Sequence, residues 1–328
     1  MEKEKISFEK LWEEKLAPAL ESLEGEKKKA KKYIFGWVMF ALTILFGPIF
    51  IAFVWFSYEE STLPTLLATL FTILVAVYIF RVIKRNKNNY KESYKEKIFD
   101  VLLNSARFDW EFLHYTGDDK KRMGNIESTF KMSSLYGGYD NFHDDEVIVS
   151  RHREASIIVS EVYVTKTVRT EKSSHEVIVF QGFFIEIKTD KNFEGETYVM
   201  TEKDGSYMKG GHPMNISRST VKETELEWND FEKFLKVMST HPREAREIFT
   251  PDFMETIYHW WTDHKKDLRF AFKGESVYIT TPSHVQFEAS VFGSLDGHKD
   301  SMREHLELLW FIEDITDMLL SNSSLKIN

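Results

Sequence analysis

The sequence predicts an α+β protein in which an N-terminal transmembrane helical hairpin precedes a cytosolic domain with an antiparallel sheet and packed helices. Two observations support this class. Two long runs near the N-terminus carry no charge, and strand-like and helix-like segments alternate through the rest of the 328 residues. We expect a cytosolic amphipathic helix over 1–32, a two-helix transmembrane hairpin over 33–83, a cytosolic helix over 84–107 and an acidic cytosolic α+β domain over 108–328.

The composition excludes several classes of protein. With 42% hydrophobic and 29% charged residues, the chain is not disordered throughout. It has no cysteine, which excludes disulfides, thiolate metal sites and thiol nucleophiles. Residues 98–328 carry 27 basic and 40 acidic side chains, a net charge of −13. Because a nucleic-acid binder needs a basic face to neutralise phosphates, we expect no nucleic-acid partner.

The uncharged runs Tyr33–Phe56 and Leu63–Phe80 are 24 and 18 residues long. A helix of the first length spans roughly 36 Å, which exceeds a hydrocarbon core of about 30 Å. Soluble helices of this length almost always expose a polar stripe, and these runs have none. The alternatives are a pair of buried core helices and a cleaved signal peptide, whose apolar region is usually shorter, about 7–15 residues.

Basic residues flank the predicted hairpin on one side only. Five lysines lie within residues 27–32, four Lys or Arg lie within 81–87, and the connecting segment has Glu59 and Glu60 but no base. The positive-inside rule therefore places both termini in the cytosol. The runs hold no charged group at mid-depth, which favours an anchor over a transport pathway. Gly47-Pro48 is interpreted as a kink.

Apolar residues recur at three- and four-residue steps on both sides of the hairpin, as expected of amphipathic helices. They are Phe8, Leu11, Trp12, Leu16, Leu20 and Leu23 before it, and Tyr90, Tyr94, Ile98, Val101 and Leu102 after it. We expect the two stripes to pair; the alternative is that Phe8–Leu23 lies flat on the membrane surface. Pro18 should kink or restart the first helix.

Segments rich in Val, Ile, Phe and Tyr predict an antiparallel meander in the acidic domain. Its strands are Glu146–Ser150, Ala155–Val164, Val177–Lys188 and Glu196–Met200, with loops at Thr165–Glu176 and Asp190–Gly195. A long polar loop over Thr201–Lys222 follows. Leu268–Phe272 and Ser276–Thr280 predict a hairpin that turns at Lys273-Gly274. Helices are expected over Asp230–Met238, over Pro251–His264 with Thr250 as cap, and from near Asp300 to Leu320.

Three stretches resemble a known family. They are FEKLWEEKLAPAL (8–20), FQGFFIEIKTDKNFEGETYV (180–199) and HPREAREIFTPDFMETI (241–257). In this order and spacing the chain resembles the bacterial membrane proteins of domain of unknown function 3137. The resemblance implies a multi-pass protein of the bacterial cytoplasmic membrane. Members of that family are often encoded beside LemA-type membrane proteins, which makes such a protein a candidate partner. The resemblance implies no chemistry, because none of the stretches is a catalytic signature.

No nucleotide-binding or hydrolase motif occurs in the sequence, and we expect no catalytic, cofactor-binding or metal residue. The densest set of potential ligands, His143-Asp144-Asp145-Glu146, is interpreted as a polar turn. His259 and His264 lie about 140° apart on a helix and cannot share a metal as neighbours. Glu255 and His259 suit a helix-surface pair. Phe253, Met254, Ile257, Tyr258, Trp260 and Trp261 are interpreted as a broad core face.

Two function classes remain for the chain. We favour a membrane-anchored cytosolic interaction or scaffold protein; the alternative is a membrane-tethered enzyme with a dispersed Asp/Glu/His site. On the terminal helix, Phe311 and Met318 lie on one line outside the main apolar half. We expect this pair to contact a partner. The alternative is that a loop, such as Thr201–Lys222, covers the two side chains.

Overall fold

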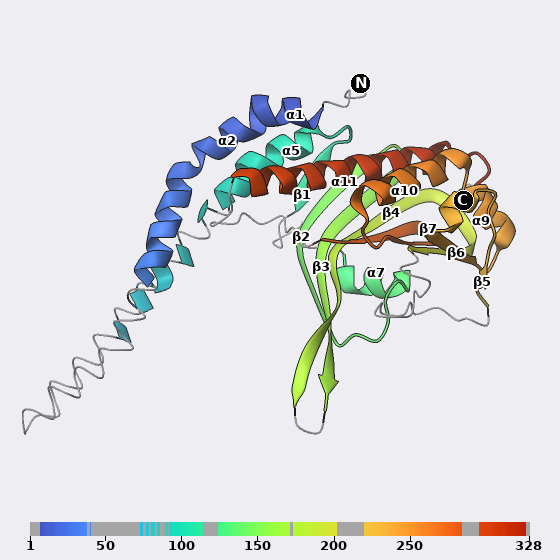
Figure 1. The fold of residues 1–328 in the computed structure, drawn as a ribbon, viewed down its shortest axis with the longest axis horizontal. Helices are drawn as coiled ribbons and strands as arrows, with labels where there is room; N and C mark the ends of the chain where they lie inside the picture. The colour runs from blue at the N-terminus through green and yellow to red at the C-terminus, as the bar shows by residue number, and fades with distance from the viewer. Residues whose placement is uncertain are drawn as a thin grey trace, which may run out of the picture. The chain divides into compact units, whose positions relative to one another are not determined.

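The computed structural model describes residues 7–37, 40, 73–74, 77–78, 80–82, 84–85, 89–90, 92–113, 124–170, 173–201, 220–283 and 295–325. The chain forms two compact units (Figure 1). The sheet unit comprises Met1–Lys5, Ala106–Phe287 and Arg303–Asn328, and the helical unit comprises Ile6–Ser105 and Glu288–Met302. The predicted boundary at 107/108 thus lies at 105/106, and residues 288–302 belong with the N-terminal helices.

Most of the predicted transmembrane hairpin over 33–83 lies outside the described residues. In the part of the chain that is described, no helix has both the length and the apolar character needed to cross a bilayer.

The helical unit contains the two predicted amphipathic segments. The first consists of α1 (Phe8–Leu11), the π-helix η1 (Trp12–Leu16) and α2 (Ala17–Ser22), and the second of the π-helix η2 (Lys95–Phe99) and α5 (Asp100–Ser105). All six apolar residues of the first stripe are buried, as are Tyr90, Tyr94, Ile98 and Leu102 of the second. Because α2 contacts η2 and α5 contacts η1, the predicted pairing is confirmed.

Pro18 has the local effect expected of a residue without an N–H. It occupies the first turn of α2, where no intrahelical donor is required. Immediately before it, Ala17 donates its backbone N–H to the Trp12 carbonyl, five residues back, which closes the wide turn of η1. Leu16 and Ala17 keep helical backbone angles, so the helix continues past the proline by way of this wider turn.

The sheet unit is built on a seven-stranded antiparallel sheet, which confirms the predicted α+β class. Its order is β1-β2-β3-β4-β6-β5, and β7 also pairs with β4. The strands are β1 (Trp110–Leu113), β2 (Asn141–His152), β3 (Ala155–Arg169), β4 (Ser174–Thr201), β5 (Lys222–Glu223), β6 (Leu235–Ser239) and β7 (Arg269–Pro282).

The prediction of two strands separated by a loop at Asp190–Gly195 was wrong, because β4 is one strand of 28 residues. The predicted hairpin at Lys273-Gly274 was wrong as well, because β7 is one strand of 14 residues. The polar residues and glycines in these stretches form paired irregularities instead of turns. The register of β4 against β7 shifts on both sides of Phe193, whose partner Gly274 has φ +59°.

Two further predictions were corrected. The expected loop Thr165–Glu176 is largely a continuation of the β3–β4 hairpin, which pairs as far as Arg169 and Ser174. The expected helix Asp230–Met238 is a short helix, α8 (Asn229–Glu232), followed by β6. Buried and half-buried residues alternate along β6, the period of a strand, and its pairing with β4 overrides the local helical spacing.

Three longer helices belong to the sheet unit, α7 (Ile126–Ser133), α9 (Pro242–Ile248) and α10 (Pro251–His264), together with the part of α11 (Leu295–Ser321) from Arg303 onward. The prediction for α10 is confirmed in full, since Thr250 caps it by accepting the Phe253 N–H at 3.4 Å. α11 begins five residues earlier than predicted. Of the long polar loop Thr201–Lys222, residues 202–219 lie outside the described part.

Gly182 marks a close approach of backbones that no other residue could occupy. It pairs with Pro282 and has φ +154°, and a Cβ placed on it would lie 2.3 Å from the Thr281 carbonyl oxygen. We expect Gly182→Ala to lower the free energy of unfolding by about 3 kcal/mol, because the backbone of β7 must move.

Gly274→Ala is the matched control for that substitution. Gly274 also has positive φ, but nothing lies within 4 Å of a Cβ there, so only the conformational cost of about 1 kcal/mol remains. Urea unfolding of the two purified variants measures the difference. Equal destabilisation would show that the close approach at Gly182 is not what requires glycine.

Candidate partner-binding site

Two stretches noted in the sequence, around 193–199 and 240–249, meet at the start of α9. The carboxylate of Glu244 accepts the backbone N–H groups of Glu194 and Gly195 at 2.6 and 2.9 Å. A side chain at Gly195 would collide with His241, since a Cβ would lie 2.3 Å from its Nδ1. The irregular part of β4 is therefore fixed directly to α9.

Hydroxyl groups extend this attachment towards β6. Thr240 accepts the Glu196 N–H at 2.9 Å and donates its own N–H to the Glu196 carbonyl at 3.0 Å. The hydroxyls of Thr197 and Ser239 are 2.8 Å apart in the buried layer below. These polar groups hold strands and helix together, and the Thr240 hydroxyl also lies 3.0 Å from Nδ1 of the neighbouring His241.

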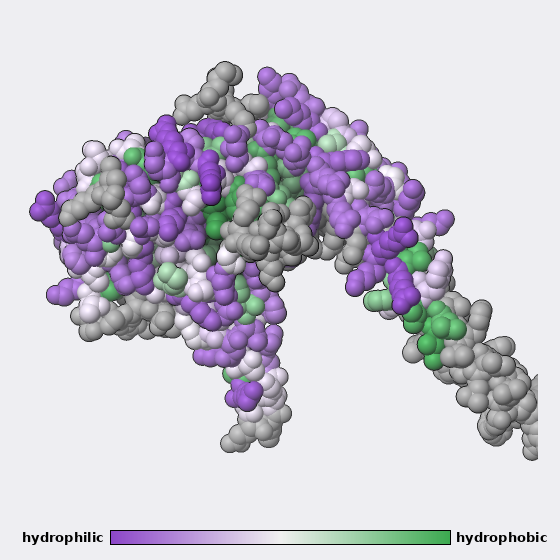
Figure 2. Space-filling view, turned by 180° about the vertical axis from the view of Figure 1, so that it is seen from behind, coloured by the Kyte–Doolittle hydropathy of each residue, from purple (hydrophilic) through white to green (hydrophobic). Residues whose placement is uncertain are grey.

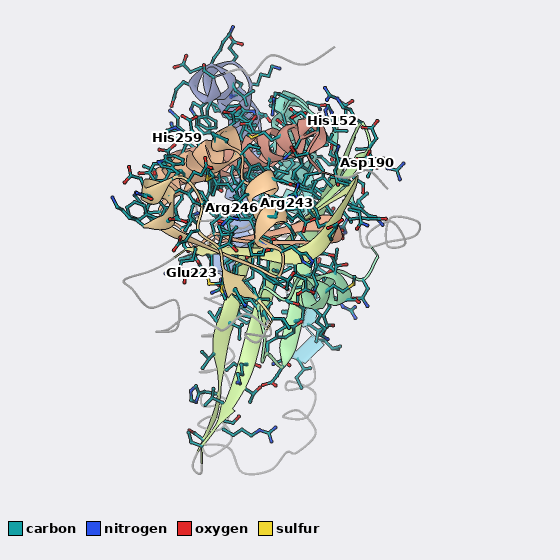
Figure 3. The ribbon with its side chains drawn as sticks, turned by 90° about the vertical axis from the view of Figure 1, so that its right-hand side faces the viewer. His152, Asp190, Glu223, Arg243, Arg246 and His259 are labelled. Carbon is teal, nitrogen blue, oxygen red and sulfur yellow. The ribbon has the colours of Figure 1, made fainter. Side chains whose placement is uncertain are left out.

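A groove of about 690 Å³ opens where α9 leads into α10, and we call it the α9 groove. Its floor is apolar, with Leu226, Phe249 and Met254 buried beneath it, and the half-buried Trp228 packs on Tyr258 with ring centroids 5.0 Å apart. The remaining lining residues are Glu227, Arg246, Glu247, Thr250, Pro251, Glu255 and Ser324. Figure 3 faces this side of the molecule, with Arg243 and Arg246 on α9 and His259 on α10.

The rim of the α9 groove is acidic, with three carboxylates against one guanidinium. The guanidinium of Arg246 already makes one hydrogen bond, in which its Nε donates to the Glu225 carbonyl at 3.3 Å. Glu247 lies 3.2 Å from Arg243, and Glu255 lies 3.4 Å from His259, as the helix-surface prediction expected. An apolar floor with an acidic rim suits an apolar surface that carries basic groups.

A second hollow of about 420 Å³ adjoins the α9 groove and shares Glu247 and Ser324 with it. Glu194, His241 and Glu244 line this hollow, but Glu244 is already engaged by the two backbone amides. No group of three or more potential metal ligands gathers within the described residues.

The helix that bounds the groove, α10, is held against α11 by stacked rings. Trp260 stacks on Phe311 at 4.6 Å and on His264 at 3.7 Å. His264 Nδ1 lies 2.9 Å from the Trp260 carbonyl and Nε2 lies 3.2 Å from Glu307. Both partners accept hydrogen bonds, so the doubly protonated ring satisfies both. Burial opposes this charge, but the Glu307 and carbonyl bonds outweigh burial and raise the pKa of His264.

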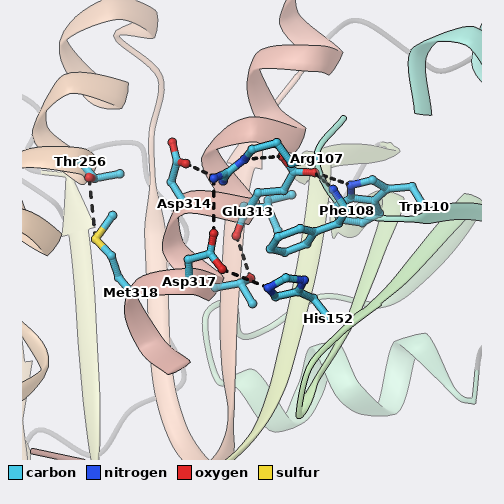
Figure 4. A network of polar contacts seen from close by, with 11 residues as sticks. Arg107, Phe108, Trp110, His152, Thr256, Glu313, Asp314, Asp317 and Met318 are labelled. Carbon is cyan, nitrogen blue, oxygen red and sulfur yellow. Dashed lines mark hydrogen bonds and ion pairs between the residues drawn. The ribbon is translucent and has the colours of Figure 1, made fainter. Parts of the chain in front are cut away.

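A second polar cluster joins α11 to the start of the sheet, and Figure 4 shows it converging on Glu313. This fully buried carboxylate accepts the Phe108 N–H at 2.8 Å, the Trp110 indole N–H at 2.9 Å and Arg107 Nε at 3.2 Å. Arg107 also reaches Asp314 at 2.6 Å and Asp317 at 3.3 Å. The cluster is a structural brace, since its members bond to one another.

The expected exposed pair on α11 is not present. Phe311 is only 4% exposed and lies between Trp260 and Phe270, and the Thr256 hydroxyl lies 3.9 Å from the sulfur of the half-buried Met318. The alternative interpretation, that another part of the chain covers the pair, was closer, because α10 contributes Trp260 and Thr256 to this cover. The pair was misplaced because α11 packs on both the sheet and α10, which widens its buried face.

The remaining candidates are also structural. His143–Glu146 lies inside β2, at a register shift between Asp144 and Val147, so the predicted polar turn was wrong. The predicted α10 core face is confirmed for Phe253, Met254, Ile257 and Trp260, which are buried. The sequence did not predict the α9 groove. Its only local signal is the alternation of Leu226 and Trp228 with Glu225 and Glu227, which indicates an extended chain with one apolar side.

Comparison with known proteins finds a family match for part of the sheet unit, and that match assigns no activity. Residues 178–320 match the family described as protein of unknown function (DUF3137). Among solved structures, the mycobacterial trehalose monomycolate transport factor A aligns at 12% identity over 62% of this chain and 88% of that one, with a TM-score of 0.30. No curated protein matches the chain.

Removing the Glu313 carboxylate should destabilise the protein strongly. Glu313→Ala leaves a buried indole N–H, a backbone N–H and part of the Arg107 guanidinium without their acceptor, so we expect a loss of about 3 kcal/mol or more. Asp314→Ala is the control, with an expected loss below about 1 kcal/mol, because Asp314 is 35% exposed. Urea unfolding measures both; similar values would mean that Glu313 is not the centre of the brace.

His264 should make stability depend on pH. Because its pKa is raised in the folded protein, its stabilisation is present below the unfolded pKa of about 6.5 and is lost as pH rises through the folded pKa. The free energy of unfolding of the wild type should therefore exceed that of His264→Gln by more at about pH 5.5 than at about pH 8.5. The exposed His259→Gln serves as control, and a gap for His264 that widens with pH would contradict the assignment.

Proposed function

Residues 178–320 belong to the family described as protein of unknown function (DUF3137), and from this premise we propose that the chain is a membrane-anchored interaction protein. In this proposal residues 33–83 hold it in the lipid bilayer as a helical hairpin. The sheet unit lies in the cytosol and presents a surface to a protein partner. Its α9 groove supports a binding role, because an open apolar floor with a charged rim suits protein contact better than chemistry.

The observation that carries the membrane anchor is the exposure of large apolar side chains. Of the twelve such residues in the described part of the chain, eight fall within 33–83, and they are 40–69% exposed. Figure 2 shows green side chains gathered on the helical segments at its right. Apolar groups concentrated in this way cost free energy in water, whereas lipid would cover them. The eight are Tyr33, Phe35, Trp37, Ile73, Leu74, Val77, Tyr78 and Phe80.

The charge pattern supports an orientation for this anchor. Lysines precede the first uncharged run and Lys or Arg follow the second, while Glu59 and Glu60 lie between the runs. We infer that both termini are cytosolic and that the membrane is the bacterial cytoplasmic membrane. A LemA-type membrane protein, suggested by the family resemblance, is the first partner to test.

A topology reporter tests the proposal. An enzyme that is active only outside the cytoplasmic membrane should be active when inserted between Ser57 and Thr62 and inactive when fused after Asn328. The chain should also stay in the membrane fraction after washing with alkaline carbonate. The opposite reporter pattern would reverse the orientation, and release of the chain by the wash would refute the anchor.

A further inference from the structure

The β3–β4 hairpin extends beyond the body of the sheet as a two-stranded ribbon (Figure 1), and we call its described residues 165–170 and 173–178 the arm. The pairing of β2 with β3 ends at Asn141 and Thr165, and that of β7 with β4 ends at Gly182 and Pro282. Among the described residues, no third strand therefore flanks the arm. Two-stranded ribbons are marginally stable in water unless something packs on them.

One face of the arm combines valines with basic groups. Lys166 pairs across the strands with Val177, and Val168 pairs with His175. Cross-strand partners and second neighbours along a strand share a face, so these four side chains lie together. We call them the valine face; it has no carboxylate, and its Val177 is 36% exposed.

The valine face complements the α9 groove of the same unit. The groove provides an apolar floor of Leu226, Phe249 and Met254, and its rim has three carboxylates against one guanidinium. The valine face provides two apolar side chains with a lysine beside them and a histidine that can become charged. The volume of the groove, about 690 Å³, accommodates several side chains.

We propose that the valine face of one copy of the chain docks in the α9 groove of a second copy. Val168 and Val177 cover the apolar floor, and Lys166 faces the carboxylates of the rim. A contact of this size is weak by itself. It gains strength from the proposed membrane anchor, on which the inference rests, because confinement to one bilayer raises the effective concentration of the two copies.

The absence of cysteine makes site-directed cross-linking unambiguous. Full-length chains carrying Val177→Cys or Ser324→Cys, with different tags, are co-expressed and treated in membranes with a short bis-maleimide. Ser324 lines the groove and is exposed, so this change keeps every rim charge. We expect a product that contains both tags, at least tenfold above the control in which Glu154→Cys, an exposed turn position, replaces Val177→Cys.

Charge reversal distinguishes docking from random collision. Lys166→Glu in the arm copy, or Glu255→Lys in the groove copy, should lower the yield about tenfold, and combining the two should restore it. Overall charge alone would not give this pattern of loss and recovery. A melting temperature within about 2 °C of wild type for each variant would confirm that these exposed changes leave the fold intact.

Three results would overturn the proposal: a yield no higher than that of the Glu154 control, no response to charge reversal, or cross-links only to other proteins. The same reaction on purified chains in detergent, at micromolar concentration, separates this question from the anchor. If carbonate releases the chain but the cross-link still forms in detergent, the anchor fails and the docking contact stands. If the chain stays in the membrane but no cross-link forms, the anchor stands and the docking contact fails.

Discussion

The pairing of β4 is the constraint on which the rest of the sheet unit depends. This strand pairs with β3 through its first half, with β7 from Gly182 onward and with β6 at its end. The positions of β3, β6 and β7 are thus all set by their pairing with β4. The core follows from this arrangement, since Phe184 and Tyr198 of β4 contribute to the same cluster as Phe130 of α7.

Helices are attached to this sheet by a few polar groups with many partners. Glu313 collects three donors from the start of the unit, and Glu244 collects two amides from β4. The buried carboxylate of Glu313 would be costly without its hydrogen bonds, and the half-buried Glu244 adds two more, so together they fix one arrangement of helix on sheet. Aromatic stacking of Trp260 on Phe311 adds a second, non-polar attachment of α10 to α11.

Local sequence signals were sufficient where an element's own residues determine its structure. The cap at Thr250 with Pro251 predicted α10, and the apolar spacing from Phe8 to Leu23 predicted the buried stripe. The signals failed where pairing with a distant strand determines the secondary structure. In β6 the apolar spacing is that of a helix, but pairing with β4 makes the segment a strand. The burial of Phe311 and the α9 groove depend on contacts between elements far apart in sequence, which periodicity within one element does not contain.

The irregularity at Phe193 also limits how the length of this chain can vary. Successive residues of a strand point to opposite faces of the sheet. One residue added within the regularly paired parts of β4 would therefore move every later side chain to the opposite face. In β4 such a change would move Tyr198 from the core to the other face of the sheet. Between Lys188 and Glu196, however, the register against β7 is already broken. A residue gained or lost between Lys188 and Phe193 shifts only positions without a partner in β7, so relatives of this chain should differ in length at that point rather than elsewhere in β4.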